Sequence, residues 1–410
     1  MKKPELLAPA GDIERLQAAV RYGADAVYLG GKLHNMRAGT PSFSLEELAT
    51  AVCFAHAAGV KVYFTCNTLP RNDEIAGLED YLAAVADTGV DAFIAADIGI
   101  MMAARRVAPH TALHISTQAG ITNYLTANEL HRLGASRVIL ARELTLPEIA
   151  GIRQNTSPEL ELEVFVHGAI CMSFSGRCLL SQYLVGRDAN RGECAQPCRW
   201  GYYLVEEKRP GQYFPVIEQD GGSYILNAKD ICLLEELDKL VEAGVTSLKI
   251  EGRAKSAYYV AAIVNAYRKG VDLYAADPQH YHAPAWLLDE TRKVSHRDYT
   301  KGFLFGPPEE GQCYQNGGYI RNWEVMAVVT SWRDGRLYCT QRNRFFAGDV
   351  LEALVPRGSV VSLTADDLQD ATGAAVAVAN RATMEFSIRC AQPLPEGTLL
   401  RKEVTGGDVK

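Results

Sequence analysis

The chain has 410 residues, of which 48% are hydrophobic and 22% charged. This composition excludes a disordered chain, and the length indicates two domains or one large barrel with an appendage. No apolar run reaches the ~18–20 residues that a bilayer-spanning helix needs, and the two N-terminal lysines lead into a strand-like run rather than a signal sequence. We therefore expect a cytoplasmic protein with no membrane contact. The formal net charge of −7 excludes a protein that is basic over its whole surface.

Short apolar runs rich in Val, Ile, Phe and Ala predict eight strands along residues 1–274. Helical stretches with apolar residues at i, i+3, i+4 and i+7 lie between them, and several end in glycine. Strands that are apolar almost throughout are typical of a parallel sheet covered on both faces, so the pattern predicts a closed, TIM-like (β/α)8 barrel. An open doubly wound sheet is disfavoured because no Gly-x-Gly-x-x-Gly turn follows an early strand. The runs begin near Glu5, Ala26, Lys61, Ala92, Ala112, Arg137, Leu162 and Ser247.

One connection interrupts this regular spacing. The seventh strand ends near Ala169 and the eighth begins near Ser247, and the expected helix starts only at Leu233. The insertion therefore follows strand seven, on the C-terminal face where barrel enzymes hold their active sites. Its residues 171–232 contain a group of cysteines, so we expect thiols over the barrel mouth: Cys171, Cys178, Cys194, Cys198 and Cys232.

The pattern changes after the eighth helix. Residues 275–317 are rich in Pro, His, Tyr and Asp, which predicts an irregular connector. Residues 318–410 contain short alternating runs separated by Gly, Asp and Pro turns, which predict a small C-terminal antiparallel β-barrel domain.

The clustered cysteines indicate a metal site. Thiolates are soft ligands suited to zinc, iron–sulfur clusters or copper, and disulfide frameworks are rare in a reducing compartment. Only Cys194 and Cys198 form a close pair, whereas structural zinc sites usually have two such pairs. The spacing therefore favours a [4Fe–4S] cluster, with zinc as the alternative. Chance clustering of buried cysteines is the remaining interpretation.

The residues around the first two of these cysteines resemble the signature of the peptidase U32 family, the collagenase-like proteins. The matching stretch runs from Glu163 through His167 and Gly168 to Cys171 and Cys178. The resemblance extends over most of the barrel, in the segments ELLAPAG, DAVYLGG, ISTQA, ARELTL, GECAQPCRW, NAKDIC and LKIEGR.

The resemblance implies a function. The length and the small C-terminal domain resemble the branch that hydroxylates the wobble uridine of transfer RNA to 5-hydroxyuridine, which is linked to the dicarboxylate prephenate. It implies an enzyme with a [4Fe–4S] cluster on four of the five cysteines, a transfer RNA substrate and a small carboxylated cosubstrate. Two alternatives stay open: a U32-type peptidase, and a non-catalytic scaffold subunit of a hydroxylation complex. The sequence predicts no oligomeric state.

Polar residues at strand ends are candidate site residues because the barrel holds them at its opening. Lys249, Glu251 and Arg253 alternate along the last strand and therefore project to one side. Between two cations, Glu251 stays ionised and can orient a base or a water. Lys249, Glu251 and the acid–base candidate His167 are the predicted catalytic residues.

A second set of strand-end residues is the predicted cosubstrate site. Guanidinium groups bind carboxylates through paired hydrogen bonds, so Arg142 and Arg253 suit a carboxylated cosubstrate. Gln118 and Asn67 also follow strands and are included in this site.

Cations interleaved with aromatic residues are typical of RNA binding, because they contact phosphates and stack on unpaired bases. The cysteine loop offers Arg187, Arg199 and Trp200. The C-terminal domain offers Arg342 and Arg344, followed by two phenylalanines, and its alternative interpretation is a solvated strand face.

Overall fold

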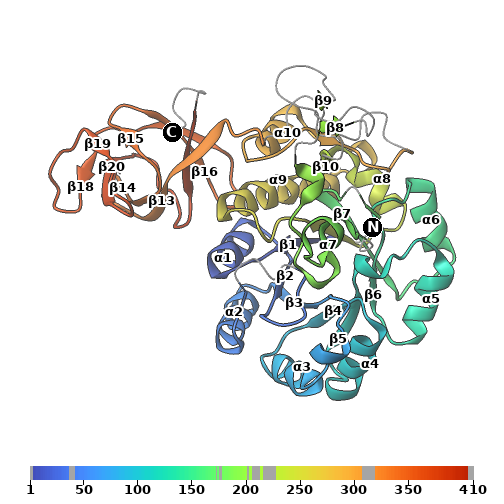
Figure 1. Ribbon diagram of the computed structural model, residues 1–410. Helices are drawn as coiled ribbons and strands as arrows, with labels where there is room; N and C mark the ends of the chain where they lie inside the picture. The colour runs from blue at the N-terminus through green and yellow to red at the C-terminus, as the bar shows by residue number, and fades with distance from the viewer. Residues whose placement is uncertain are drawn as a thin grey trace.

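Eight parallel strands close into a ring in the computed structural model, which describes residues 3–36, 42–171, 173–174, 178–200, 203–205, 213–215, 228–306 and 319–404. The strand order is β11-β1-β2-β3-β4-β5-β6-β7, and pairing of β11 with β7 closes the barrel. Figure 1 looks roughly along the barrel axis. The predicted (β/α)8 barrel is therefore confirmed. Its strands are β1 (Glu5–Pro9), β2 (Ala26–Gly30), β3 (Lys61–Cys66), β4 (Ala92–Ala95), β5 (Ala112–Ile115), β6 (Arg137–Ile139), β7 (Glu161–Ala169) and β11 (Ser247–Ile250).

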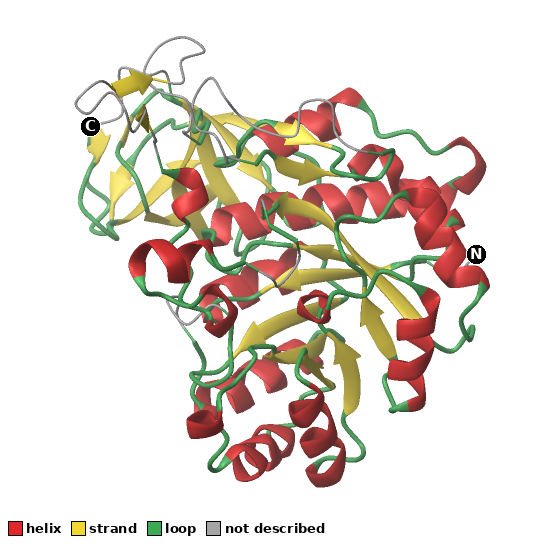
Figure 2. Ribbon diagram, turned by 45° about the vertical axis from the view of Figure 1, so that its right-hand side comes forward, coloured by secondary structure: helices red, strands yellow, loops and turns green. Residues whose placement is uncertain are grey.

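Helices surround the ring of strands (Figure 2). Their starts follow the expected capping chemistry: the side chains of Asp12, Ser44, Asp97 and Asn123 each accept a hydrogen bond from a backbone amide three residues on. None of the described helices is long and apolar enough to cross a bilayer. The helices are α1 (Ile13–Tyr22), α2 (Leu45–Ala57), α3 (Leu78–Asp87), α4 (Ile98–Val107), α5 (Tyr124–Arg132), α6 (Leu146–Gln154), α8 (Leu237–Glu242) and α9 (Ala257–Ala276).

Alternating strand residues build two layers of core. One set faces the helices and forms the largest apolar cluster, which includes Leu6, Val27 and Phe64. The other set points into the barrel lumen and forms a separate cluster that includes Tyr28 and Phe165. The lumen is therefore a packed core rather than a channel.

Two short strands extend the barrel sheet beside β7. Strand β10 (Asp230–Cys232) pairs antiparallel with β7, and β12 (Tyr299–Thr300) pairs with β10. The predicted connector also contains α10 (Ala285–Arg292). The remaining short elements around the barrel are α7 (Leu180–Val185), β8 (Tyr203–Val205), β9 (Tyr213–Pro215) and the 3-10 turns Asn72–Glu74, Thr117–Ala119, Ala189–Arg191, Pro197–Arg199, Leu234–Glu236 and Pro278–His280.

The predicted small antiparallel β-domain is confirmed, in the form of a half-barrel. Seven strands follow the order β17-β16-β21-β13-β14-β20-β18 and enclose their own apolar core. Strands β15 (Phe345–Phe346) and β19 (Val378–Ala379) form a separate pair. The seven are β13 (Trp323–Arg333), β14 (Arg336–Gln341), β16 (Val350–Leu354), β17 (Val361–Thr364), β18 (Gln369–Asp370), β20 (Glu385–Arg389) and β21 (Leu399–Glu403).

The half-barrel packs on the barrel beside α1 and α9 (Figure 1). The buried Tyr22 hydroxyl lies within hydrogen-bond distance of two carbonyl oxygens that can accept its proton, those of Leu354 at 2.8 Å and Gly397 at 3.0 Å. Arg401 is fully buried and its Nη2 reaches Oε1 of Glu290 at 2.7 Å. These contacts fix the two parts to each other.

Candidate active site at the barrel mouth

The segment after β7 crosses the barrel mouth. Residues 178–200, which we call the strap, reach the loops that follow β2 and β3 on the other side of the ring. The amide of Leu69 donates to the carbonyl of Asn190 at 3.3 Å, and the Arg191 guanidinium lies 2.8 Å from the Glu74 carboxylate. Gly192 passes so close to the Asn35 carbonyl that an added Cβ would lie 2.6 Å from it. In Figure 1, α7 of the strap overlaps the ring of strands, in the view along the barrel axis.

Hydrogen bonds also connect the strap internally. The Asn190 side chain donates to the carbonyl of Cys178 at 3.2 Å, and the amide of Ala195 donates to the buried Ser181 hydroxyl at 3.0 Å. The segments that carry Cys178 and Cys194 are thereby held against each other, so the fold places several thiols on the mouth face.

The five candidate ligands differ in exposure. Cys171 and Cys194 are exposed, Cys178 and Cys198 are half-buried, and Cys232 is buried. Burial raises the pKa of the Cys232 thiol, whose sulfur lies 3.9 Å from the Tyr267 hydroxyl. Within the described ranges, no three Cys, His, Asp or Glu side chains form a group that could hold a metal ion. The donors suit a soft metal, but this arrangement does not gather them.

A charged network in the lumen contains Lys249. Its ammonium lies 2.9 Å from the Glu163 carboxylate, which also accepts from Arg137 at 2.9 Å. Burial lowers the pKa of Lys249, and the Glu163 carboxylate opposes this shift. From the sequence, Glu163 is identified only as part of the family signature, and its role as the partner of Lys249 is missed. The signal that could have shown it is a lone carboxylate within an apolar strand, which indicates a buried cation nearby.

Glu251 and Arg253 lie just after β11, which ends at Ile250, and they meet Lys249 around Tyr28. The Tyr28 hydroxyl donates to the Glu251 carboxylate at 3.0 Å, and Lys249 and Arg253 lie over the Tyr28 ring at 4.4 Å and 5.7 Å from its centroid. Nη1 of Arg253 also donates to the side chains of Asn35, at 2.7 Å, and Thr65, at 2.9 Å. The three residues therefore lie around one ring, although only Lys249 belongs to the strand.

Three of the predicted cosubstrate residues lie on loops after β3, β5 and β6. The Ser116 hydroxyl accepts a hydrogen bond from the Asn67 side chain at 3.4 Å and one from the backbone amide of Gln118 at 3.3 Å. The Arg142 guanidinium lies 4.0 Å from the centroid of the Phe165 ring and donates to the carbonyl of Ala169 at 3.1 Å. Its buried Nε has no hydrogen-bond partner in the described part of the chain.

His167 lies away from these groups. It is fully buried, and its ring contacts those of Tyr259, Tyr267 and Tyr299 on α9 and β12. Burial lowers the pKa of His167 to about 3. The histidine is therefore neutral at pH 7 and lies behind the mouth, and its acid–base role stays a prediction.

The predicted RNA-binding residues occupy two places. Arg187 and Trp200 are exposed on the strap, and the Arg199 side chain lies outside what the structure describes. In the half-barrel, Arg342 pairs with Glu14 at 3.1 Å and Arg344 lies 5.7 Å from the centroid of the Phe346 ring.

The position of Glu14 places this second group on the mouth side. Glu14 is in the first turn of α1, and that helix begins where β1 ends, at the mouth. Phe346 is exposed and Phe345 is buried in the half-barrel core, so only Phe346 is available for stacking.

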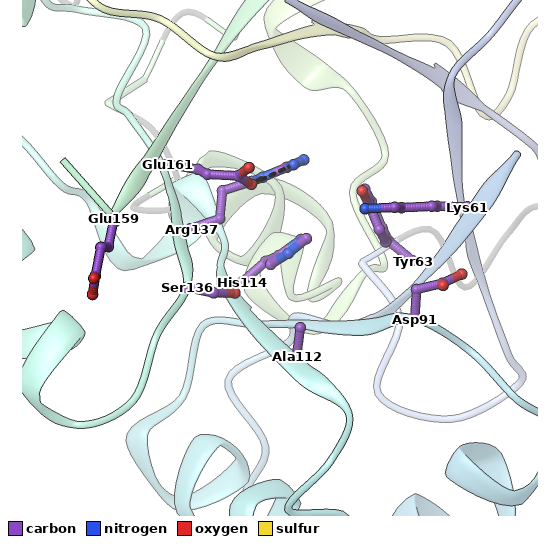
Figure 3. Close-up of a pocket in the computed structure, with 9 residues that line it drawn as sticks. All are labelled: Lys61, Tyr63, Asp91, Ala112, His114, Ser136, Arg137, Glu159 and Glu161. Atoms are coloured by element: carbon purple, nitrogen blue, oxygen red, sulfur yellow. Dashed lines mark hydrogen bonds and ion pairs between the residues drawn. The ribbon is translucent and has the colours of Figure 1, made fainter.

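A cavity of about 260 Å³ opens at the opposite end of the barrel (Figure 3). There Arg137 reaches Glu161 at 2.7 Å, while Lys61 and Tyr63 lie across the opening. Its lining comes from the N-terminal ends of strands, where conserved chemistry in barrels serves stability rather than catalysis. The mouth is therefore the candidate active site. The cavity is lined by Lys61, Tyr63, Asp91, Ala112, His114, Ser136, Arg137, Glu159 and Glu161.

Fold and site together define a (β/α)8-barrel protein with a cysteine-bearing strap across its mouth and a C-terminal antiparallel half-barrel. The chain belongs to peptidase family U32, whose model matches residues 11–313. The model of the U32 C-terminal domain matches residues 321–401.

Curated relatives extend over most of the chain. The tRNA hydroxylation protein P1 of Bacillus subtilis (strain 168) is 39% identical over 91% of this chain and 88% of its own. The tRNA hydroxylation protein P of Escherichia coli (strain K12) is 36% identical over 92% of each chain. An uncharacterized protease of Methanocaldococcus jannaschii is 41% identical over 80% of this chain and 81% of its own.

Proposed function

We propose that this protein is an enzyme that hydroxylates RNA, and that its substrate is the wobble uridine of transfer RNA, converted to 5-hydroxyuridine. The observation that carries the proposal is the similarity over 91% of this chain to a relative named as a tRNA hydroxylation protein. The geometry supports it, because the strap places thiols on the mouth face, and Glu251 and Arg253 lie around Tyr28 just after the last strand, at the end where barrel enzymes hold reacting groups.

We also propose a [4Fe–4S] cluster as the cofactor, with zinc as the alternative metal. Four of Cys171, Cys178, Cys194, Cys198 and Cys232 would hold it, and thiolates are its usual ligands. When bound, such a cluster supplies one-electron redox chemistry. The strap contributes by keeping its thiols on the mouth face through the contacts of Asn190 and Arg191.

The proposed cosubstrate is a dicarboxylate such as prephenate, bound at Arg142. This guanidinium has a buried Nε without a partner in the described part of the chain, and a buried donor is costly until an acceptor reaches it. A carboxylate at the mouth would satisfy that donor. The predicted partner Arg253 already donates to Asn35 and Thr65.

The experiment is mass spectrometry of nucleosides in transfer RNA from cells lacking the gene. We expect loss of 5-hydroxyuridine-derived nucleosides and their return when the gene is restored on a plasmid. Unchanged nucleosides would overturn the proposed substrate. Anaerobic purification with iron and acid-labile sulfide assays tests the cofactor, and a colourless protein loaded with zinc would contradict it.

Two further arms separate the alternatives. Arg142→Gln should raise the cosubstrate concentration needed for half-maximal hydroxylation, whereas Arg253→Gln should mainly lower stability. Because one relative is named as a protease, peptide cleavage is assayed on the same preparations. Cleavage that copurifies with the protein and disappears in Glu251→Gln would favour the peptidase.

A further inference from the structure

The strap carries a group of exposed apolar side chains. Tyr183 on α7 is 86% exposed, and Leu179, Leu184, Val185 and Trp200 are exposed as well. Single exposed apolar residues are ordinary on a protein surface, but a group of them beside an active site indicates a binding surface.

The local fold explains which side chains point outward. At 100° per residue, Leu179 and Tyr183 lie one turn apart on the same face of α7, nearly opposite Ser181. Ser181 is fully buried and accepts the amide of Ala195 at 3.0 Å, which fixes that face against the strap. Leu179 and Tyr183 are therefore held outward, and we call them the α7 platform.

We propose that the α7 platform stacks an unpaired base of the RNA substrate, next to the nucleotide that enters the mouth. The inference rests on the proposed function. Unpaired bases are recognised by stacking on aromatic side chains, and single-stranded loops are the parts of RNA that offer them. A nucleotide whose base reacts inside an enzyme must also leave its own stack, which frees its neighbours to stack elsewhere.

Charge favours RNA as the occupant. Arg187 lies two residues after the end of α7 and is exposed, and it has no ion-pair partner in the part of the chain that the structure describes. A cation four residues after an exposed ring can bind a phosphate of the same strand whose base stacks on the ring. The platform also comes from a helix of six residues, too small for the roughly 800 Å² per partner that a stable protein interface buries.

The test measures binding of the full-length protein to a fluorescent RNA hairpin with a single-stranded loop. We expect Tyr183→Ala to weaken binding roughly 5- to 150-fold, because stacking contributes about 1–3 kcal/mol per base. Tyr183→Phe should bind within about twofold of the wild type, since the ring remains. The dependence on salt should stay unchanged, because no phosphate contact is lost.

Two controls complete the design. Trp286→Ala removes an exposed aromatic on α10 and should leave binding unchanged, as should Tyr183→Ala for a blunt RNA duplex. Wild-type affinity of Tyr183→Ala, or equal losses for Tyr183→Ala and Tyr183→Phe, would overturn the inference. A lower molecular mass of Tyr183→Ala than of the wild type in light scattering would instead assign the platform to a contact between copies of the chain.

Different experimental outcomes contradict the α7 platform and the proposed function. A wild-type protein that neither binds the hairpin nor modifies transfer RNA contradicts the function. A wild-type protein that does both, with a Tyr183→Ala variant that equals it, contradicts only the platform. Circular dichroism verifies that each variant is folded.

Discussion

The ammonium of Lys249 lies 2.9 Å from the carboxylate of Glu163, and both side chains are buried in the barrel lumen. Arg137 lies 2.9 Å from the same carboxylate, so one anion serves two cations. The Ser247 hydroxyl donates to it as well, at 3.2 Å. Removing one partner of a buried ion pair leaves the other charge buried without compensation. The resulting loss of stability is larger than the stability that the intact pair adds relative to apolar residues in its place.

We therefore predict unequal effects of the two substitutions. Glu163→Gln leaves the buried Lys249 without its ion-pair partner, whereas Arg137 keeps Glu5 and Glu161. It should lower the free energy of unfolding by about 3–5 kcal/mol. Lys249→Met should cost less, because Glu163 keeps Arg137 and methionine retains most of the apolar stem. Urea unfolding measures both, and Lys3→Met, in an exposed pair with Asp272, should change stability by less than about 1 kcal/mol. A larger loss for Lys249→Met would show that the lysine, not the carboxylate, is central.

The buried His114 predicts a loss of stability in acid. Burial lowers its pKa well below the ordinary 6.5, and the nearby cations Arg137, Lys249 and Lys61 lower it further. Below pH 6.5 this histidine is protonated in the unfolded chain but stays neutral in the folded chain. The free energy of unfolding therefore falls as the pH drops below 6.5 and is unaffected by this group above it. The loss from this histidine should be at most about 2 kcal/mol at pH 5, the limit set by the unfolded-state pKa.

The matching variant is His114→Gln, which cannot titrate. Its unfolding free energy should be lower at pH 7 and should change less between pH 7 and pH 5 than that of the wild type. The exposed His110→Gln is the control and should keep the wild-type slope. An unchanged slope in His114→Gln would mean that other groups dominate the acid sensitivity.

The barrel could be predicted from the sequence because each strand is an apolar run long enough to recognise. The two extra strands could not: Asp230–Cys232 and Tyr299–Thr300 are too short to show a period, and pairing with β7 defines them. His167 illustrates the same limit. Because Phe165 faces the lumen, strict alternation would place the His167 ring there too. The register between β7 and β11 shifts after Lys249, and the ring contacts α9 instead.

A steric constraint at the end of β7 gives the third prediction. Gly168 has a φ of +106°, and a Cβ there would lie 2.6 Å from the carbonyl oxygen of Glu251. Gly168→Ala should therefore cost the backbone strain and, in addition, a displacement of β7 from the last strand. Gly59 also has a positive φ, of +72°, but nothing lies within 4 Å of its Cβ position.

Comparison of the two alanine variants separates these costs. Gly59→Ala should lower the free energy of unfolding by about 1–2 kcal/mol, the cost of the left-handed conformation alone. Gly168→Ala should exceed that value in the same urea titration. Equal losses would show that the end of β7 relaxes freely, in which case the position of Cys171, three residues on, is not set by this contact.

The contact between barrel and half-barrel determines how the second RNA-binding group is tested. Deleting the half-barrel would expose Tyr22 and Glu290, which lose their partners Leu354, Gly397 and Arg401. Binding by a truncated chain would then report damage to the barrel as well as lost RNA contacts. Single substitutions in the full-length protein avoid this problem.

Arg344 and Arg342 should differ in their contributions to RNA binding. Arg344 has no carboxylate partner in the described part of the chain, whereas Arg342 pairs with Glu14 at 3.1 Å. We predict that Arg344→Ala weakens transfer RNA binding for all sequences alike and lowers the slope of log affinity against log salt by about 1, because one phosphate contact is lost. Arg342→Ala should have a smaller effect, and Glu14→Gln, which frees Arg342, should strengthen binding and steepen the slope. Fluorescence anisotropy over a series of salt concentrations measures the affinity and the salt slope of all three variants. Slopes identical to that of the wild type would show that the RNA does not contact this side of the half-barrel.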